Sequence, residues 1–388
     1  MPRGARVDSA GGLSAPRTPR GYLAKGKSMR PRDEAELAEM VAGAAGPLLV
    51  RGGGTRTLGA VEGEVLETAG LTGVRLYEPA ALTLVVGAGT PLAEVERLLA
   101  GEQQRLAFEP PDLRGLLGRG GVSTIGGVMA ANASGPRRAQ AGAARDALIG
   151  VRFVDGRGQV VKNGGRVMKN VTGYDLVKLM AGSRGALGVL SEVSLKLQAM
   201  PEAEATLVVE GMGEEDGLSG LRKALGSPFD ISGAARHSGR SLIRVEGMAG
   251  SVAYRVGRLT ALVGGEVTVV EGTASADLWR EVRDGVPLAA REGEIWRIVT
   301  LPTATAEIAA RLEGVAVWDW GGGLLWLCLE PGRGAEVAAA VAGRGHAVLV
   351  RGDSAPVFPP EAPEVAALVA GLKAQFDPKG ILNRGMMG

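Results

Sequence analysis

Cysteine and histidine are both scarce in this 388-residue sequence, which holds one cysteine, Cys328, and two histidines, His237 and His346. A single cysteine excludes a disulfide framework and every zinc or iron–sulfur site built from cysteines. Two histidines leave little for a histidine-built metal centre, so we expect no metal site. No apolar run approaches the ~18 residues that a membrane-spanning helix needs, so we expect no direct membrane span.

A large excess of charge of one sign is also missing from most of the chain. Residues 1–32 carry eight of the 44 basic side chains and one of the 42 acidic ones. Residues 33–388 therefore carry 36 basic and 41 acidic groups, a net charge of −5. Binding to nucleic acid needs a basic face that neutralises phosphates, so we expect no nucleic-acid partner. Glycine, in contrast, is abundant. Its 62 residues are more than twice the usual share of about 7%, which indicates tight turns and backbone close to a ligand.

Residues 1–29 form a basic tail that we predict to be disordered, because it is rich in Arg, Gly, Ser and Pro and lacks a periodic apolar pattern. Such a start can resemble an organelle transit peptide, or be an over-extended start before Met29. Within the tail, Gly21–Ser28 match the P-loop pattern. Proline-rich residues stand where that motif needs a buried strand, so we interpret the match as accidental.

Two glycine loops follow apolar strands in the first half of the chain, at residues 52–55 and 123–127. Consecutive glycines leave backbone amides free to point at an anion, which is typical of a pyrophosphate nest. Neither loop has the spacing of the dinucleotide-binding fingerprint. Each loop alone is typical of a tight turn, but the pair favours a large diphosphate cofactor between two small α/β lobes.

The second half of the chain predicts a repeated βαββαβ order, the ferredoxin-like pattern in which two helices cover one face of an antiparallel sheet. A helical connector at 276–284 separates the two units. The predicted strands are 205–210, 230–237, 241–246, 266–271, 294–301, 315–320, 323–330 and 346–351, and the predicted helices are 215–226, 250–263, 304–313 and 333–343. A last helix is expected at 364–375.

Seven segments in order give the sequence a resemblance to the vanillyl-alcohol-oxidase/PCMH-type FAD-binding family. They are VRGGGTRT (50–57), VVGAGTPLAEVERLL (85–99), FEPPD (108–112), STIGGVMAANASG (123–135), ARDALIGVRFVDGRG (144–158), KNVTGYDLVKLMAGSRGALGVLSEVSLKL (169–197) and FDPKGILNRG (376–385). Within the family the chain looks most like the smaller FAD-binding subunit of bacterial glycolate oxidase.

The resemblance implies an α+β fold with a two-lobed PCMH-type FAD-binding domain and a cap domain made of the two βαββαβ units. The implied boundaries are 1–29 for the tail, 30–200 for the FAD-binding domain, 201–351 for the cap domain, and 352–388 for a C-terminal segment that returns to the FAD-binding domain.

The resemblance also implies which residues hold FAD. The pyrophosphate would lie against Gly52, Gly53, Gly54, Thr55, Ser123, Thr124, Gly126 and Gly127. The flavin end and the ribityl chain would lie along Pro111, Asp112, Asn132 and Ser134, with backbone contacts from Gly188, Val189 and Leu190, and Asn383 would bring the C-terminus back. Covalent members of the family present a histidine where Thr55 stands, so FAD should be bound noncovalently.

One departure from the family concerns catalysis. Dehydrogenases of the family carry an H-x-G-D-G-N-x-H element that supplies metal ligands and a base, and it aligns by eye with residues 319–326, where both histidines are gone. Arg283 matches the family's cap arginine that binds a substrate carboxylate, a task for which a guanidinium fork is suited. The alternative for Arg283 is an ion pair with Asp284 or Glu281.

Two hypotheses about function follow. The first is a flavoenzyme subunit that oxidises a short 2-hydroxy acid such as glycolate or D-lactate to the 2-oxo acid and passes electrons to an iron–sulfur partner subunit. The second is a non-catalytic FAD-binding, electron-relay or scaffold subunit beside a larger homologous FAD subunit. No signal peptide is apparent, so we expect a cytoplasmic location, with partners as the route to the inner membrane.

Overall fold

The computed structural model describes residues 28–59, 61–165 and 173–387. The tail that we predict to be disordered lies outside this range except for its last two residues, and so does the P-loop match except for Ser28. Among the described residues, no helix is both long and apolar enough to cross a membrane.

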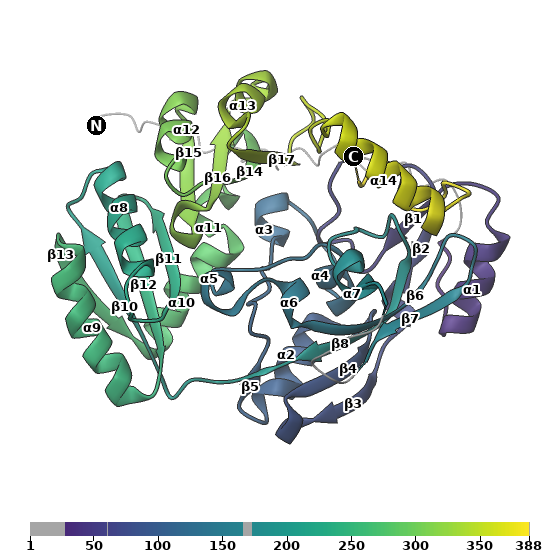
Figure 1. The fold of residues 1–388 in the computed structure, drawn as a ribbon, viewed down its shortest axis with the longest axis horizontal. Helices are drawn as coiled ribbons and strands as arrows, with labels where there is room; N and C mark the ends of the chain where they lie inside the picture. The colour runs from purple at the N-terminus through teal and green to yellow at the C-terminus, as the bar shows by residue number, and fades with distance from the viewer. Residues whose placement is uncertain (1–27, 60, 166–172, 388) are drawn as a thin grey trace, which may run out of the picture.

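The first part of the chain forms two sheets, a short parallel pair and a five-stranded antiparallel sheet (Figure 1). The pair consists of β1 (Leu48–Arg51) and β2 (Glu64–Glu67), with α1 (Glu34–Gly43) packed beside it. The larger sheet has the order β3-β4-β8-β6-β7. Its strands are β3 (Val74–Glu78), β4 (Thr83–Gly87), β8 (Val189–Lys196), β6 (Leu148–Val154) and β7 (Val160–Gly164).

Short helices cover the five-stranded sheet and connect it to the rest of the molecule. Apolar side chains of α2, such as Val95 and Leu99, and of α4, such as Ile125 and Val128, pack with the strands in one buried cluster. The helices of this part are α2 (Leu92–Ala100), α3 (Arg114–Leu117), α4 (Ile125–Ala130), α5 (Arg138–Ala141), α6 (Ala144–Ala147) and α7 (Leu176–Met180), and a small pair is formed by β5 (Gln104–Arg105) and β9 (Gln198–Ala199).

The second part of the chain is one eight-stranded sheet of order β13-β10-β12-β11-β15-β16-β14-β17 (Figure 1). Each half has the ferredoxin-like order, and the two halves are mirrored about β11 and β15, which share the single register pair Arg236–Trp318. The strands are β10 (Ala203–Glu210), β11 (Ile231–His237), β12 (Arg240–Gly247), β13 (Glu266–Glu271), β14 (Glu294–Thr300), β15 (Val315–Asp319), β16 (Leu324–Leu329) and β17 (Gly345–Arg351). All eight agree with the predicted strands to within two residues.

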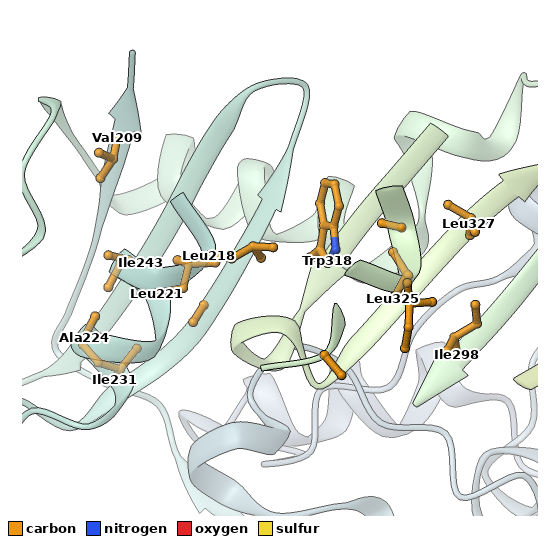
Figure 2. Close-up of a cluster of buried hydrophobic side chains, with 14 of the residues drawn as sticks. Val209, Leu218, Leu221, Ala224, Ile231, Ile243, Ile298, Trp318, Leu325 and Leu327 are labelled. Carbon is orange, nitrogen blue, oxygen red and sulfur yellow. The ribbon is translucent and has the colours of Figure 1, made fainter. Parts of the chain in front are cut away.

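The helices of this sheet divide between its two faces. Those predicted from the repeat, α8 (Glu214–Leu225), α9 (Ala249–Val263), α12 (Thr305–Leu312) and α13 (Gly334–Val341), share one apolar core on one face. Figure 2 shows this core, with Leu218 and Ile243 in one half, Ile298 and Leu325 in the other, and Trp318 between them. The connector helices α10 (Gly272–Asp284) and α11 (Val286–Ala289) cover the opposite face, which is turned toward the first part of the chain.

The C-terminal segment returns to the first part of the chain after α14 (Pro363–Phe376). The backbone N–H of Leu48 donates to the carbonyl of Ile381 at 2.7 Å, so this segment extends the β1 edge. The Asn383 amide then joins two loops, because its Nδ2 donates to the carbonyls of Val50, at 3.1 Å, and of Arg184, at 2.7 Å. Hydrogen bonds between residues as far as 333 positions apart in the sequence therefore hold the C-terminal segment against the first part of the chain.

Candidate functional site

A cleft containing about 740 Å³ of space, open to solvent, lies between β1, the start of α4 and the loop before β8. Both glycine loops line it. Of the residues that the resemblance assigns to FAD, those that line the cleft are Gly52, Gly53, Gly54, Thr55, Thr124, Gly126, Gly127, Gly188, Leu190 and Asn383. The sequence-predicted loops therefore meet at one place, although they lie some 70 residues apart in the chain.

Glycine is required where the two loops touch. A Cβ on Gly53 would lie 1.5 Å from the carbonyl oxygen of Val122, and one on Gly52 would lie 2.4 Å from the Thr124 hydroxyl oxygen. A Cβ on Gly126 would lie 2.6 Å from the Cβ of Ala88. At Gly53 and Gly126 the loop backbone thus packs directly on other backbone. The N–H of Gly126 donates to the carbonyl of Ala88 and that of Gly127 to the Thr124 hydroxyl, so the glycine amides left uncovered at the cleft wall are those of residues 52–54.

The cleft is also electropositive, because two arginines that line it have no acidic partner among the described residues. Arg56 donates to the Ser123 hydroxyl, the Thr55 hydroxyl and the Pro111 carbonyl, while its Nε has no partner. The Arg184 guanidinium makes no hydrogen bond or ion pair in the part of the chain that the structure describes, and lies 5.4 Å from the Phe358 ring. Burial lowers the pKa of both arginines to about 10, so both remain charged at neutral pH.

These features fit a diphosphate-containing cofactor. Two unneutralised guanidiniums supply the charge that a diphosphate needs, and bare glycine amides supply hydrogen-bond donors. Among residues 28–59, 61–165 and 173–387, no group of three or more His, Cys, Asp or Glu side chains is placed to hold a metal ion.

Two further FAD-assigned residues reach the cleft only through Arg56. The Ser123 hydroxyl and the Pro111 carbonyl both accept hydrogen bonds from its guanidinium. Sequence reasoning missed Arg56 and Arg184, although Arg56 directly follows Thr55 and Arg184 is in the loop that leads to Gly188. The feature that could have indicated them is an arginine in a glycine-rich stretch, because glycine itself supplies no charge for a phosphate.

Four other assigned residues do not line the cleft, and their contacts to FAD stay predictions. The Asp112 carboxylate accepts from Arg114 Nε at 2.9 Å and Nη2 at 2.7 Å. The Asn132 and Ser134 side chains accept from the backbone N–H groups of residues 145 and 144, each at 2.9 Å. The side chain of Val189 is fully buried in the core beside α1.

Arg283 forms an ion pair with Asp284, which is one of the alternatives that the sequence allowed for it. Its Nε and Nη2 donate to the two carboxylate oxygens of Asp284 at 2.7 and 2.8 Å. Asp284 also accepts from the backbone N–H of Asp112 at 2.8 Å, so the pair bridges α10 to the first part of the chain. The fork of Arg283 is thus already filled by a carboxylate of the protein.

The segment that lacks the family's two histidines lies where β15 turns into β16. Asp319 is 3% exposed, and its carboxylate accepts from the Trp320 backbone N–H at 2.7 Å. Burial raises the pKa of Asp319 to about 7. The Trp320 Nε1–H donates to the carbonyl of Gly135 at 3.0 Å, which brings this turn against the first part of the chain.

A buried network of charges also joins the two parts of the molecule. Arg244 donates to the two oxygens of Glu109 at 2.9 and 2.8 Å, and Arg137 Nε donates to Glu246 at 2.9 Å. Arg105 adds a third cation to Glu246. Burial raises the pKa of Glu109, but Arg244 and Arg137 outweigh it and hold that pKa at about 2. The sequence signal for this network was a strand, β12, in which charged residues alternate with apolar ones.

A two-lobed α/β fold with a basic, glycine-walled cleft and a ferredoxin-like sheet beside it is that of a flavoprotein. The FAD binding domain family matches residues 28–164. Alkyldihydroxyacetonephosphate synthase shares the fold, with a TM-score of 0.66 at 15% identity over 91% of this chain and 75% of that one.

Proteins of similar sequence define the family more closely than the fold does. The chain is 34% identical to glycolate oxidase subunit GlcE of Escherichia coli (strain K12) over 344 residues, 88% of this chain and 92% of that protein. It is 34% identical to glycolate oxidase subunit GlcD of Bacillus subtilis (strain 168) over 166 residues, 42% of this chain and 34% of that protein. It is 27% identical to a D-lactate dehydrogenase of Archaeoglobus fulgidus over 222 residues, 55% of this chain and 47% of that protein.

The chain belongs to the family of FAD-binding oxidoreductase subunits that includes these glycolate oxidase subunits. The resemblance stated from the seven segments is therefore confirmed, and so are the PCMH-type fold and FAD as the cofactor.

Proposed function

We propose that this chain is the FAD-binding subunit of a glycolate-oxidase-like complex that oxidises a short 2-hydroxy acid, such as glycolate or D-lactate, to the 2-oxo acid. The observation that carries the proposal is the basic, glycine-walled cleft in a chain that matches a glycolate oxidase subunit over 88% of its length. Electrons would leave for an iron–sulfur subunit, because one cysteine cannot hold a cluster.

In this reaction the substrate loses a hydride from its C2 atom and a proton from its hydroxyl group. When bound, FAD supplies the acceptor for the two electrons. The chain's own contribution begins with binding. Arg56 and Arg184 would neutralise the diphosphate, and the amides of residues 52–54 would donate hydrogen bonds to it. The Asn383 side chain fixes the position of the loop that carries Arg184, because it donates to that residue's carbonyl.

A second candidate function, a non-catalytic FAD-binding or electron-relay subunit, is favoured by the turn between β15 and β16. Asp319 and Trp326 stand where the family's histidines stand, and the fork of Arg283 is filled by Asp284. In that case the catalytic partner would be a larger homologous FAD subunit that keeps the histidines. The two candidates share the cofactor and differ only in where substrate is turned over.

The experiment has two stages. First, the purified chain should show flavin absorbance, release FAD on heating and regain the spectrum when FAD is added. A colourless chain that takes up no FAD would refute both candidates. Second, the FAD-loaded chain is mixed with glycolate or D-lactate and an electron-accepting dye. Reduction of the dye by the chain alone eliminates the non-catalytic function, whereas reduction only after the larger homologous subunit is added supports it.

A further inference from the structure

Arg297, on β14, lies among aromatic rings rather than acids. Its guanidinium carbon is 5.5 Å from the centre of the Trp320 ring and 5.8 Å from that of the Trp326 ring. Within the part of the chain that the structure describes, its side chain makes no hydrogen bond and no ion pair. It is half-buried, so part of it can still reach a ligand. Five donors of one guanidinium are therefore left for a partner that the protein does not supply.

Arg138, on α5, approaches the same indole from the first part of the chain. Its guanidinium carbon is 4.4 Å from the centre of the Trp320 ring, and its side chain likewise has no hydrogen bond or ion pair among the described residues. The hydrogen bond from Trp320 Nε1 to the carbonyl of Gly135 fixes the ring at this boundary. Two cations from two different parts of the fold thus converge on one half-buried tryptophan.

Protein groups balance the local charge only in part. No carboxylate forms an ion pair with Arg138 or Arg297 among the described residues, although Asp146 acts on Arg138 from a greater distance. Burial, together with the nearby charges of Arg138 and Arg184, lowers the pKa of Arg297 to about 10. Asp319 is the one acid that acts on Arg297 in the described part of the chain, and burial raises the pKa of that carboxyl to about 7. A carboxyl that is half protonated at neutral pH leaves this region with an excess of positive charge.

Such an excess is costly unless a ligand neutralises it. Arg184 lines the FAD cleft and its charge acts on Arg297, so the excess positive charge extends from the cleft to β14. A small anion bound there would lie between the two parts of the molecule. The planar fork of a guanidinium matches a carboxylate through two parallel hydrogen bonds.

We propose that Arg297 and Arg138, held by Trp320, form the site that takes the carboxylate of the 2-hydroxy acid. The site replaces Arg283, whose fork is occupied by Asp284. The inference rests on the proposed function for the identity of the acid, and it specifies a carboxylate group bound by the two unpaired arginines.

The test uses the full-length, FAD-loaded chain and two small probes. Oxalate is a two-carbon dicarboxylate with no C–H bond to oxidise, and glycolamide is a neutral analogue of glycolate. Isothermal titration should show that oxalate binds and glycolamide does not. Arg297→Met and Arg138→Met should each weaken oxalate binding by about tenfold to a hundredfold, because each removes charged hydrogen-bond donors. The matched control is Arg280→Met, whose arginine is exposed and paired with Asp277 on the surface of α10.

FAD content is measured in every sample, which separates the two proposals. An absence of FAD in the wild-type chain defeats the proposed function. Normal FAD with no oxalate binding, or with oxalate binding that both Met variants leave within twofold of wild type, overturns the arginine site alone. A loss of oxalate binding in Arg283→Met, with none in the Arg297 and Arg138 variants, also overturns it. Arg297 and Arg138 lie on different elements, so a folding defect in one variant leaves the other to decide.

Discussion

Two groups of arginines in this protein, one buried and one half-buried, differ in their partners. At the boundary between the two parts of the chain, Arg137 and Arg244 are 7% and 0% exposed and are bound by glutamates. Around the cleft and Trp320, Arg184 and Arg297 have no acidic partner within hydrogen-bond distance among the described residues. Arginine thus occurs in both groups. Glutamates neutralise its charge in the first group, and no described acid pairs with it in the second.

This difference in partners distinguishes arginines that stabilise the fold from arginines that are available to bind a ligand. A buried ion pair that is fully bonded holds two elements in one arrangement, and the loss of one partner is expensive. A guanidinium without a partner contributes little to folding, and it persists where an anion from outside completes it. The comparison therefore yields opposite expectations for substitutions in the two groups.

The largest effect is expected in the paired group. Glu109→Gln removes the carboxylate that Arg244 holds through two hydrogen bonds, so a charged, fully buried guanidinium loses its partner. We expect the free energy of unfolding to fall by about 3–5 kcal/mol. Urea denaturation measures it. Glu215→Gln is the control, because this glutamate is 62% exposed in its pair with Arg222 and should cost less than about 1 kcal/mol. Equal losses in the two variants would contradict the role given to the network.

A pH effect of intermediate size is expected at Asp319. The pKa of its carboxyl is raised to about 7 in the folded protein from 3.8, so the folded state keeps a proton that the unfolded state loses in that window. Stability from this group is present below pH 3.8 and is lost as the pH rises toward 7. Asp319→Asn should therefore raise the free energy of unfolding at pH 8 by up to about 4 kcal/mol and change it little at pH 4. A variant that is less stable than wild type at pH 8 would contradict this.

A substitution in the glycine wall of the cleft tests FAD binding while both cleft arginines stay in place. Gly126→Ala places a Cβ 2.7 Å from the carbonyl oxygen of Ala88, so the loop has to move. We expect FAD to bind at least about tenfold more weakly, since overpacking typically costs 1–3 kcal/mol. Flavin fluorescence titration measures the Kd. Gly120→Ala is the control, because nothing lies within 4 Å of its Cβ. An unchanged Kd in the Gly126 variant would show that FAD does not use this wall.

The smallest effect is expected for Arg184→Met, and its direction distinguishes the two groups of arginines. The side chain has no partner to leave unsatisfied, so the apoprotein should keep its unfolding midpoint. Binding of FAD should weaken by about tenfold, because one charged donor group is lost. Arg184→Lys should recover part of the affinity through its charge. If the apoprotein is strongly destabilised instead, Arg184 belongs with the structural group.

Local patterns were enough to predict much of this molecule. The strands of the large sheet follow from short apolar runs, as in β16. The glycine loops at 52–55 and 123–127 correctly indicated where two loops pack closely together. These signals are short-range, since each is contained in a strand or a loop of fewer than ten residues.

The rest of the fold and of the site depends on contacts between residues far apart in the sequence, which no local pattern encodes. Glu109 and Arg244 are 135 residues apart, and nothing near either one indicates its partner. The mirrored union of the two βαββαβ units through β11 and β15 likewise depends on packing rather than on the repeat. For Arg283 the sequence offered a substrate role and an ion pair, and only the geometry of its neighbour showed the pair with Asp284.

The contacts of Asn383 set an order of events during synthesis. Val50 and Asn383 are 333 residues apart and bond directly at the cleft. The eight-stranded sheet, by contrast, is made from one continuous stretch of chain, residues 203–351. On the ribosome that sheet can close its core while the cleft still has an open side. The wall of the cleft is completed only after residue 383 has emerged, so we expect FAD to bind firmly only once the C-terminal segment has returned to β1.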